Sequence, residues 1–358
     1  MGLALKWDIT YRCNLHCSHC INGNLLDSES KDLSCKDIVS LVQKIQTCVP
    51  VDYIHFLGGE PTVHSDFIQI CKEMESLGIN FGFNTNAINF KTKGFDVVLD
   101  NPMLKAIVIS LDAPIAEVND AIRGKNVFNL VCENAKHIVS KKRDHTNLVV
   151  NTVVGKANLP YILDMIDFAI ELGANQLDLL QLIAEGNASE TDDTLTQTEE
   201  IALVEDIARK YPEIKEKIKL VPKFVRPIAK DYCNQVLGLD FPDIQHLCGA
   251  GCGFAFINNE GYIYPCDRLF QRNMSGQNAK SHSLVDYEFF DVWQNNIFNE
   301  PYEFIEGSEY LTFTPCNECK YFMKTCFPCY LYKDTGVGNS FSFNVCNHFI
   351  DKIKDIRR

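Results

Sequence analysis

Cysteine is the residue that most constrains how this sequence can fold, because its sixteen copies among 358 residues fall largely into two groups. Three lie between residues 13 and 20, and eight lie between residues 248 and 346. In a chain without a secretion signal, clustered cysteines indicate metal binding more often than disulfide bonds. The other five stand alone, and we expect them in the core as small apolar side chains: Cys35, Cys48, Cys71, Cys132 and Cys233.

The composition is typical of a folded protein that binds neither membranes nor nucleic acids. Hydrophobic residues make up 46% of the chain, which is enough for a large core. We find no run of 18 apolar residues and no signal-peptide pattern in the first residues. A net charge of −13 disfavours binding to a phosphate backbone. We therefore expect a cytoplasmic protein.

The first half of the chain alternates short apolar runs with amphipathic segments. The predicted strands are Leu5–Thr10, Tyr53–Leu57, Phe81–Asn84, Ala106–Leu111, Leu148–Val154 and Gln176–Leu182. The predicted helices are Asp37–Thr47 after a cap at Ser34, Ser65–Leu77, Val127–Ser140 after a cap at Asn126, and Tyr161–Leu172. This alternation predicts an α/β fold with a parallel sheet, either open and twisted or closed into a partial (β/α)6 TIM-like barrel. Ligands should bind at the carboxyl ends of the strands.

Changes in composition divide the chain into three segments. Residues 1–190 form the α/β core, and residues 191–245 are predicted to be a helical connector that ends near the apolar run Ile218–Val221. Residues 246–358 are rich in Cys, Gly and aromatic residues. We expect the last segment to be a small domain that metal, more than a large core, holds together.

The first cysteine group, Cys13, Cys17 and Cys20, forms a C-x3-C-x2-C run directly after the first predicted strand. Three thiolates at this spacing can hold a [4Fe–4S] cube and leave its fourth iron open to a small molecule. A zinc site with His16 or His19 as the fourth ligand is the alternative.

A second motif, Gly58-Gly59-Glu60-Pro61, follows the second predicted strand. Glycines let a ligand approach the backbone closely, and a carboxylate beside them can accept hydrogen bonds from an ammonium group. At this distance from the cysteine run, the motif indicates a ligand site that both strand ends share.

The two motifs together resemble the signature of the radical S-adenosylmethionine (SAM) superfamily. The resemblance implies that the open iron chelates SAM, and that an electron from the cluster cleaves SAM to a 5′-deoxyadenosyl radical. That radical then abstracts a hydrogen atom from the substrate. The resemblance also implies an electron donor such as flavodoxin or ferredoxin.

The same resemblance implies further SAM-binding residues at later strand ends. Gly58, Gly59, Glu60 and Pro61 correspond to the family motif that binds the SAM amino group. Asn86 and Ser110 are candidates for the ribose or carboxylate, Arg123 for the carboxylate, and the backbone at Leu182 for adenine. Taken singly, each fits an ordinary turn or cap equally well.

The C-terminal cysteines form the series Cys248-x3-Cys252, Gly261-x4-Cys266, Cys316-x2-Cys319-x6-Cys326-x2-Cys329 and Cys346. This series resembles the SPASM domain, although the family usually spaces its middle group x2, x5, x3, which shifts Cys326 by one place. The resemblance implies two auxiliary [4Fe–4S] clusters, and hence three clusters in all. One would use Cys248, Cys252, Cys266 and Cys329, and the other Cys316, Cys319, Cys326 and Cys346. Zinc sites are the alternative.

Asp267 directly follows Cys266. In the anaerobic sulfatase-maturating branch that the sequence resembles, an Asp at this place acts as a general base. A carboxylate next to a cluster can take a proton while an electron leaves through iron. A turn Asp that caps backbone amides is the alternative.

These features favour a radical SAM/SPASM oxidoreductase that modifies a peptide or protein by oxidation or crosslinking. The first strand starts by Leu5, so we expect substrate recognition through a separate peptide-recognition protein or through a short motif that is read directly. The alternative enzyme is a dehydrogenase or epimerase of a small molecule such as an aminocyclitol or sugar alcohol. A non-catalytic iron–sulfur or zinc protein is the third interpretation.

Overall fold

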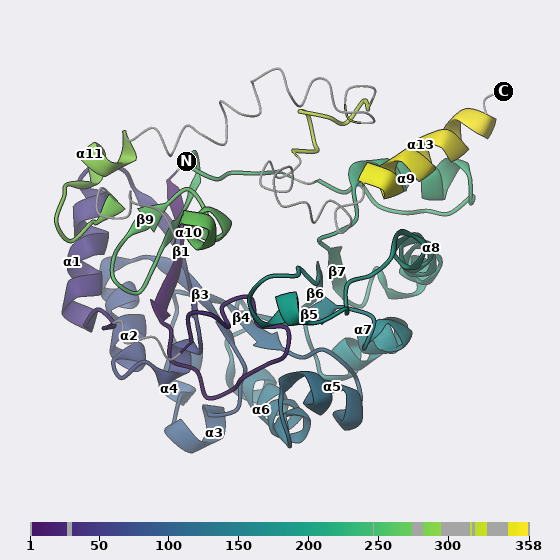
Figure 1. The fold of residues 1–358 in the computed structure, drawn as a ribbon. Coiled ribbons are helices and arrows are strands. Elements are labelled where there is room, and N and C mark those ends of the chain that lie inside the picture. Colours follow the sequence, from purple (N-terminus) through teal and green to yellow (C-terminus); the bar gives the residue numbers. More distant parts are fainter. Residues whose placement is uncertain are drawn as a thin grey trace.

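The computed structural model describes residues 2–26, 31–245, 247–273, 282–294, 316, 319–327 and 343–356. Its centre is a nine-stranded sheet with the strand order β7-β6-β5-β4-β3-β2-β1-β8-β9. All neighbouring strands from β7 to β8 run parallel, and β9 is antiparallel to β8. The sheet curves, and helices cover its outer face as in a partial barrel (Figure 1). The predicted α/β fold is therefore confirmed.

The strands, in chain order, are β1 (Leu3–Thr10), β2 (Val51–Gly58), β3 (Asn80–Thr85), β4 (Leu104–Ser110), β5 (Asn147–Val154), β6 (Gln176–Gln181), β7 (Lys219–Pro222), β8 (Phe254–Ile257) and β9 (Ile263–Tyr264). All six predicted strands are present, with ends within two residues of the predicted ones.

The helices are α1 (Cys35–Gln46), α2 (Phe67–Leu77), α3 (Phe90–Lys93), α4 (Asp96–Leu99), α5 (Ala116–Arg123), α6 (Val127–Lys141), α7 (Ile162–Glu171), α8 (Gln197–Ile214), α9 (Pro227–Gln235), α10 (Asp267–Asn273), α11 (Phe289–Trp293) and α13 (Phe343–Ile356). Short 3-10 turns are η1 (Pro61–Val63), η2 (Leu159–Tyr161) and η3 (Gly186–Glu190). No helix among these described segments has the length and apolar character of a membrane span.

The start of α1 is set by its own capping residues, whereas the start of α6 is set by a residue of the preceding helix. The Ser34 side chain accepts a hydrogen bond from the Asp37 N–H and the Asp37 side chain returns one, which is the capping box that starts α1. Asn126 occupies the predicted N-cap of α6, but its φ is 64° and its side chain makes no capping bond. Instead the Asp120 Oδ1 accepts the Phe128 N–H at 2.7 Å. The side-chain cap expected from Asn126 is therefore wrong.

Alternate residues of the strands face two different environments. On β1, Leu5 and Trp7 are 1% and 0% exposed in the core between the sheet and the helices. Lys6, between them, points to the inner face and lines a cavity there. The strands thus have one apolar face and one face with polar residues, which positions functional groups inside the curved sheet.

Both later segments of the chain contribute strands to the sheet. The run Ile218–Val221, predicted to belong to a helical connector, overlaps β7, which pairs with β6 with Lys219 opposite Gln176. From the C-terminal segment, β8 pairs with β1 with Ala4 opposite Phe254. Periodicity alone does not distinguish a short apolar run in a strand from one in a buried helix, so the strand at Ile218–Val221 was not predicted. The domain boundaries at residues 190 and 245 stay predictions.

The C-terminal helix α13 packs against α9 (Figure 1). The rings of Tyr232 and Phe349 stack with centroids 4.6 Å apart. This contact holds α13, which carries Cys346, against α9.

Candidate active site

The three N-terminal cysteines lie in the loop after β1, at the carboxyl end of the sheet. Cys13, Cys17 and Cys20 line a cavity of about 520 Å³ on the inner face. The glycine turn after β2 and polar residues from β3 and β4 line the same cavity. The expected convergence of these strand ends on one ligand site is therefore present in the structure.

Backbone hydrogen bonds fix the cysteine loop and leave its thiols facing the cavity. The Ser18 N–H donates to the Ile122 carbonyl at 2.9 Å, which joins the loop to α5. The Asn187 Nδ2 donates to the Cys17 carbonyl at 3.0 Å, and the Asn187 N–H donates to the Cys20 carbonyl at 2.9 Å. The loop is thus held by contacts with α5 and with η3.

Burial makes these thiols resist ionisation in the metal-free chain. It raises the pKa of Cys13 to about 12. Burial also raises the pKa of Cys17 and of Cys20, and the Arg123 charge opposes the effect at both. Because cysteine binds metal as the thiolate, a cluster held by these three thiols would have to displace their protons and supply the balancing positive charge.

The donor set suits an iron–sulfur cluster. Three soft thiol ligands share one cavity wall, and thiolates are the usual ligands of such clusters. Among the described residues, no three His, Cys, Asp or Glu side chains converge as the ligands of a single ion do.

The glycines after β2 are required by the neighbouring backbone. Gly58 has a φ of 133°, and a Cβ there would lie 2.1 Å from the Thr10 carbonyl oxygen. A Cβ on Gly59 would lie 2.4 Å from the Arg12 carbonyl oxygen. The Gly59 N–H also donates to the Thr10 carbonyl at 2.8 Å. The glycine pair therefore lets β2 end directly against the start of the cysteine loop.

Glu60 joins the ends of two strands. Its Oε1 accepts bonds from the Thr62 hydroxyl at 2.6 Å and the Thr85 hydroxyl at 2.8 Å, and its Oε2 accepts the Asn86 N–H at 2.7 Å. The residue is 1% exposed, and burial raises its pKa although these bonds oppose the rise. Oε2 accepts the Asn86 N–H, and a carboxylate oxygen can accept two hydrogen bonds. A ligand could therefore donate a further hydrogen bond to this oxygen.

The other predicted SAM contacts lie on the cavity with one exception. Asn86, Ser110 and Arg123 line it together with Pro61. The Asn86 Nδ2 also donates to the Asn14 Oδ1 at 2.7 Å, which ties the end of β3 to the cysteine loop. Leu182 is 2% exposed and its N–H donates to the Val154 carbonyl, while the neighbouring residues 181 and 183 line the cavity.

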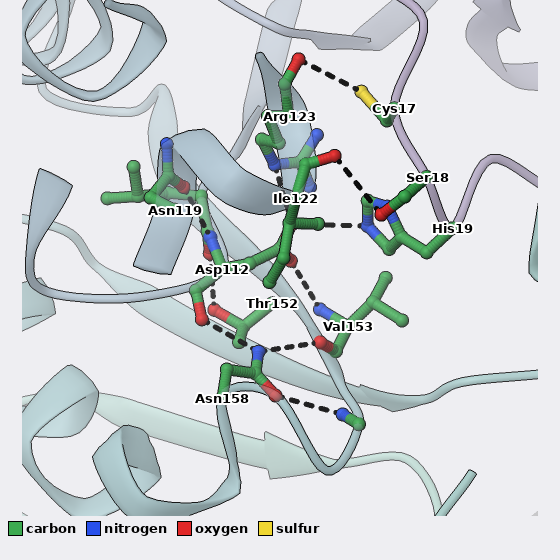
Figure 2. Close-up of polar contacts among 12 residues, drawn as sticks. Cys17, Ser18, His19, Asp112, Asn119, Ile122, Arg123, Thr152, Val153 and Asn158 are labelled. Carbon is green, nitrogen blue, oxygen red and sulfur yellow. Dashed lines mark hydrogen bonds and ion pairs between the residues drawn. The ribbon is translucent and has the colours of Figure 1, made fainter. Parts of the chain in front are cut away.

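Arg123 has a buried partner that the sequence analysis did not identify. The Arg123 Nε lies 2.7 Å from the Asp112 Oδ2, and the His19 Nε2 lies 3.1 Å from the same oxygen (Figure 2). Asp112 is fully buried. Burial alone would raise the pKa of Asp112, but the charges of Arg123 and His19 outweigh it and hold that pKa below the usual range.

Residues of two charged pairs also line the cavity. The Lys6 Nζ lies 3.7 Å from the Asp267 Oδ1, and the Arg268 Nη2 lies 2.6 Å from the Glu185 Oε1. Lys6, Asp267 and Arg268 line the cavity that the three cysteines also line. Asp267, the predicted general base, therefore shares one space with the cysteine loop.

A second carboxyl group lies near Asp267. Asp8 is 4% exposed on β1. Burial first, and then the negative charge of Asp267, raise the pKa of Asp8 to about 8. The inner face thus holds a carboxyl group that stays protonated at neutral pH.

A chain of polar groups lies on the inner face of β2 and β3. The Tyr53 hydroxyl lies 3.0 Å from the His55 Nδ1, and the His55 Nε2 lies 2.7 Å from the Asn84 Oδ1. Asn84 reaches the cavity. Burial lowers the pKa of His55 to about 4, so this side chain is neutral at physiological pH.

The C-terminal cysteines divide into two sets. Cys316, Cys319, Cys326 and Cys346 line one small cavity of about 30 Å³, beside Arg226. In the other predicted set, Cys252 precedes β8 and Cys266 follows β9, so the antiparallel hairpin brings both to one end. Cys248 lies shortly before them, and Cys329 lies outside the described residues.

The sequence analysis did not identify three polar residues that hold Arg123 or the cysteine loop in place. Asp112 carries a weak signal, because it stands one residue beyond the predicted fourth strand, where ligand-binding residues gather. His19 was considered only as a zinc ligand. Asn187 carries no sequence signal, since it acts through the loop carbonyls of Cys17 and Cys20.

Known proteins resemble this chain in sequence and in fold. The family model described as "Radical SAM superfamily" matches residues 7–169. The mycofactocin maturase MftC of Mycolicibacterium smegmatis is 29% identical over 304 residues, which is 83% of this chain and 72% of the relative.

Two solved structures share the fold. SuiB of Streptococcus suis, bound to the precursor peptide SuiA, superposes with a TM-score of 0.69 at 19% identity, over 89% of this chain and 70% of that one. The protein anSMEcpe with bound AdoMet gives a TM-score of 0.72 at 16% identity, over 99% and 96%.

The segment that the family model matches supplies much of the cavity lining. It begins in β1 and includes Cys13, Cys17, Cys20, the turn at Gly58 and Arg123. Similarity to this family implies one [4Fe–4S] cluster and SAM as cofactors. The residues gathered on the cavity thus include several from the segment in which the chain is similar to the radical SAM superfamily.

Proposed function

We propose that this chain is a radical SAM enzyme that modifies a peptide or protein, by an oxidation or a crosslink that begins with removal of a hydrogen atom. One observation carries the proposal: Cys13, Cys17 and Cys20 line the same cavity as Lys6 and Asp267. A cofactor held by the cysteine loop and a substrate beside Asp267 would meet within one cavity.

The chain's own residues would hold SAM by its charged groups. The free acceptor position on Glu60 suits the amino group, and the Arg123 guanidinium suits the carboxylate. Asn86 and Ser110 would contact the ribose or carboxylate, and the backbone near Leu182 the adenine. When bound, the cluster and SAM supply an organic radical that takes a hydrogen atom from the substrate.

On the substrate side, Asp267 would act as the general base. Oxidation of a carbon centre removes a proton in addition to the hydrogen atom, and a carboxylate on the cavity wall can accept it. The Lys6 Nζ lies 3.7 Å from the Asp267 Oδ1 and would help to hold this carboxylate at the cavity wall.

The C-terminal cysteines would hold two auxiliary [4Fe–4S] clusters that accept the electron of such an oxidation. The shared cavity of Cys316, Cys319, Cys326 and Cys346 supports one ligand set. The other set would be Cys248, Cys252, Cys266 and Cys329. A flavodoxin or ferredoxin would reduce the first cluster.

A peptide substrate is favoured by the relatives. The similar chain from M. smegmatis is named a maturase, and SuiB was solved with its precursor peptide. The oxidoreductase activity proposed here would act on a side chain or Cα of such a peptide, delivered by a recognition protein or read directly through a short motif.

The test has two stages under anaerobic conditions. Reconstituted, dithionite-reduced protein should release 5′-deoxyadenosine from added SAM, and failure to do so would overturn the radical SAM assignment to this cavity. Candidate precursor peptides are then added and analysed by mass spectrometry. A peptide product that has lost two hydrogens supports the proposal. Turnover of an aminocyclitol or sugar alcohol, with every peptide unchanged, would replace it with small-molecule oxidation or epimerisation.

A further inference from the structure

We infer that Asp112 is a positioning residue that fixes the Arg123 guanidinium and the cysteine loop in one arrangement. The inference rests on the proposed use of Arg123 as a SAM contact and of the loop as a cluster site. Nothing in the chemistry of SAM cleavage requires a carboxylate at this place, so its role must follow from what it contacts.

The Asp112 side chain is fixed on every side (Figure 2). Its Oδ2 lies 2.7 Å from the Arg123 Nε and 3.1 Å from the His19 Nε2. Its Oδ1 accepts the Val153 N–H at 2.9 Å. With zero exposure and partners on both oxygens, this carboxylate cannot rotate without losing bonds that water cannot replace.

The backbone of Asp112 is equally fixed. Its N–H donates to the Asn119 Oδ1 at 3.0 Å, and its carbonyl accepts the Asn158 Nδ2 at 2.7 Å. Asn119 lies on α5, and Asn158 precedes η2. The carboxylate therefore stands at a rigid point where β4, α5 and β5 meet.

The contact with Arg123 decides how the guanidinium is oriented. The Asp112 Oδ2 lies 2.7 Å from the Arg123 Nε, so the ion pair holds the guanidinium at its Nε edge. Arg123 also lines the cavity, so its guanidinium borders the space in which a ligand would lie. An anion in the cavity would then meet a guanidinium that needs no reorientation, which lowers the entropy lost on binding.

The contact with His19 connects the same carboxylate to the cysteine loop. His19 lies between Cys17 and Cys20 in the chain. The loop also meets the end of α5, where the Cys17 Sγ lies 3.8 Å from the Arg123 carbonyl oxygen (Figure 2). One carboxylate thus positions the proposed cation for SAM and the part of the loop that carries Cys17 and Cys20.

Asp112→Asn tests this inference because the amide keeps the size of the side chain and removes its charge. Asp96→Asn is the matched control, since Asp96 pairs with a histidine in the same way, with its Oδ1 2.7 Å from the His137 Nε2, but at the surface. Each variant is compared with the unchanged chain in three measurements: the dissociation constant for SAM in cluster-loaded protein, the change that SAM produces in the EPR spectrum of the reduced cluster, and the iodoacetamide labelling rate of Cys17 and Cys20 in cluster-free protein.

We expect Asp112→Asn to weaken SAM binding at least tenfold, to abolish the SAM-dependent EPR change and to speed labelling of both cysteines severalfold. Asp96→Asn should leave all three unchanged. SAM affinity and labelling rates in Asp112→Asn equal to those of the unchanged chain would overturn the inference.

Two further variants test the contact with Arg123 and the contact with His19 separately. They also replace Asp112→Asn if that variant does not fold. Arg123→Lys keeps the positive charge without the guanidinium fork, and should weaken SAM binding while cysteine labelling stays unchanged. His19→Gln should speed labelling and leave SAM affinity within twofold. The opposite pattern would overturn the inference. If the unchanged chain binds no SAM, the proposed function fails, whereas the labelling arm still reports on the hold of Asp112 on the loop.

Discussion

Lys6 and Asp267 come from β1 and from the start of α10, yet the Lys6 Nζ lies 3.7 Å from the Asp267 Oδ1. Both side chains line the cavity that the three cysteines of the loop also line. The pair brings a residue next to the C-terminal cysteines into the inner face of the N-terminal barrel. The pair thus places the proposed general base on the cavity in which the proposed cofactor would bind.

The proposed general base can be tested by Asp267→Asn. The amide cannot accept a proton, so we expect substrate oxidation to fall roughly 100-fold, the usual contribution of a general base. Release of 5′-deoxyadenosine should continue, because SAM cleavage does not need this group. Mass spectrometry of the substrate and chromatography of the nucleoside give the two rates. Unchanged substrate turnover would remove Asp267 from the mechanism.

Removal of one cluster ligand should stop the reaction at its first step. Cys17→Ala leaves two of the three thiols on the cavity wall, and we expect no detectable 5′-deoxyadenosine from SAM. Cys48→Ala is the control, since Cys48 does not lie in the core as expected: it is exposed just after α1 and does not line the cavity. Equal SAM cleavage by the two variants would show that the cluster is not held as proposed.

The glycine turn should tolerate no side chain. In Gly58→Ala, the new Cβ would lie 2.1 Å from the Thr10 carbonyl oxygen, so β2 must move away from the cysteine loop. We expect SAM affinity to drop at least tenfold. Gly78→Ala provides the comparison: Gly78 also has a positive φ, of 68°, but its Cβ meets nothing within 4 Å, so only about 1 kcal/mol of backbone strain is expected. Titration calorimetry with SAM and thermal unfolding distinguish a local clash from general destabilisation.

Asp8 should make stability fall as pH rises. Its pKa is raised to about 8 in the folded chain, chiefly by burial, whereas an unfolded aspartate titrates near 4. Between these values the folded state binds the extra proton, so unfolding becomes easier with increasing pH, by up to about 1.4 kcal/mol per unit. Urea unfolding from pH 5 to 8 should show this slope for the unchanged chain and a flatter one for Asp8→Asn. Parallel curves would contradict the buried, protonated Asp8.

Iron content tests the auxiliary ligands. Three four-iron clusters predict about twelve irons per chain, and Cys346→Ala should reduce this number to about eight. Cys233→Ala is the matched control, because Cys233 is a buried cysteine on α9, which packs against the helix that carries Cys346. Iron and sulfide analysis of anaerobic protein gives the counts. About twelve irons in Cys346→Ala would exclude Cys346 as a ligand, and stoichiometric zinc would favour the zinc alternative.

Local patterns in the sequence were enough to predict most elements of the core. The capping box at Ser34 and Asp37 and the apolar face of α7, with Met165 and Ile166 fully buried, are present as expected. These features depend on residues within one or two helical turns of each other, so spacing alone encodes them. The side-chain cap expected at Asn126 failed because Asp120, a residue of the preceding helix, accepts the Phe128 N–H instead.

By itself, the sequence determined the position of the cysteine loop, the turn at Gly58 and the parallel order of the first strands, since a motif directly after a strand must lie at its carboxyl end. Tertiary structure alone decided that Asp112 holds both Arg123 and His19, that Lys6 faces Asp267, and that β7 and β8 extend the sheet. The physical reason is range. Helix caps and strand faces are set by neighbours along the chain, whereas a buried ion pair forms between side chains that only the packing of distant elements brings within hydrogen-bond distance.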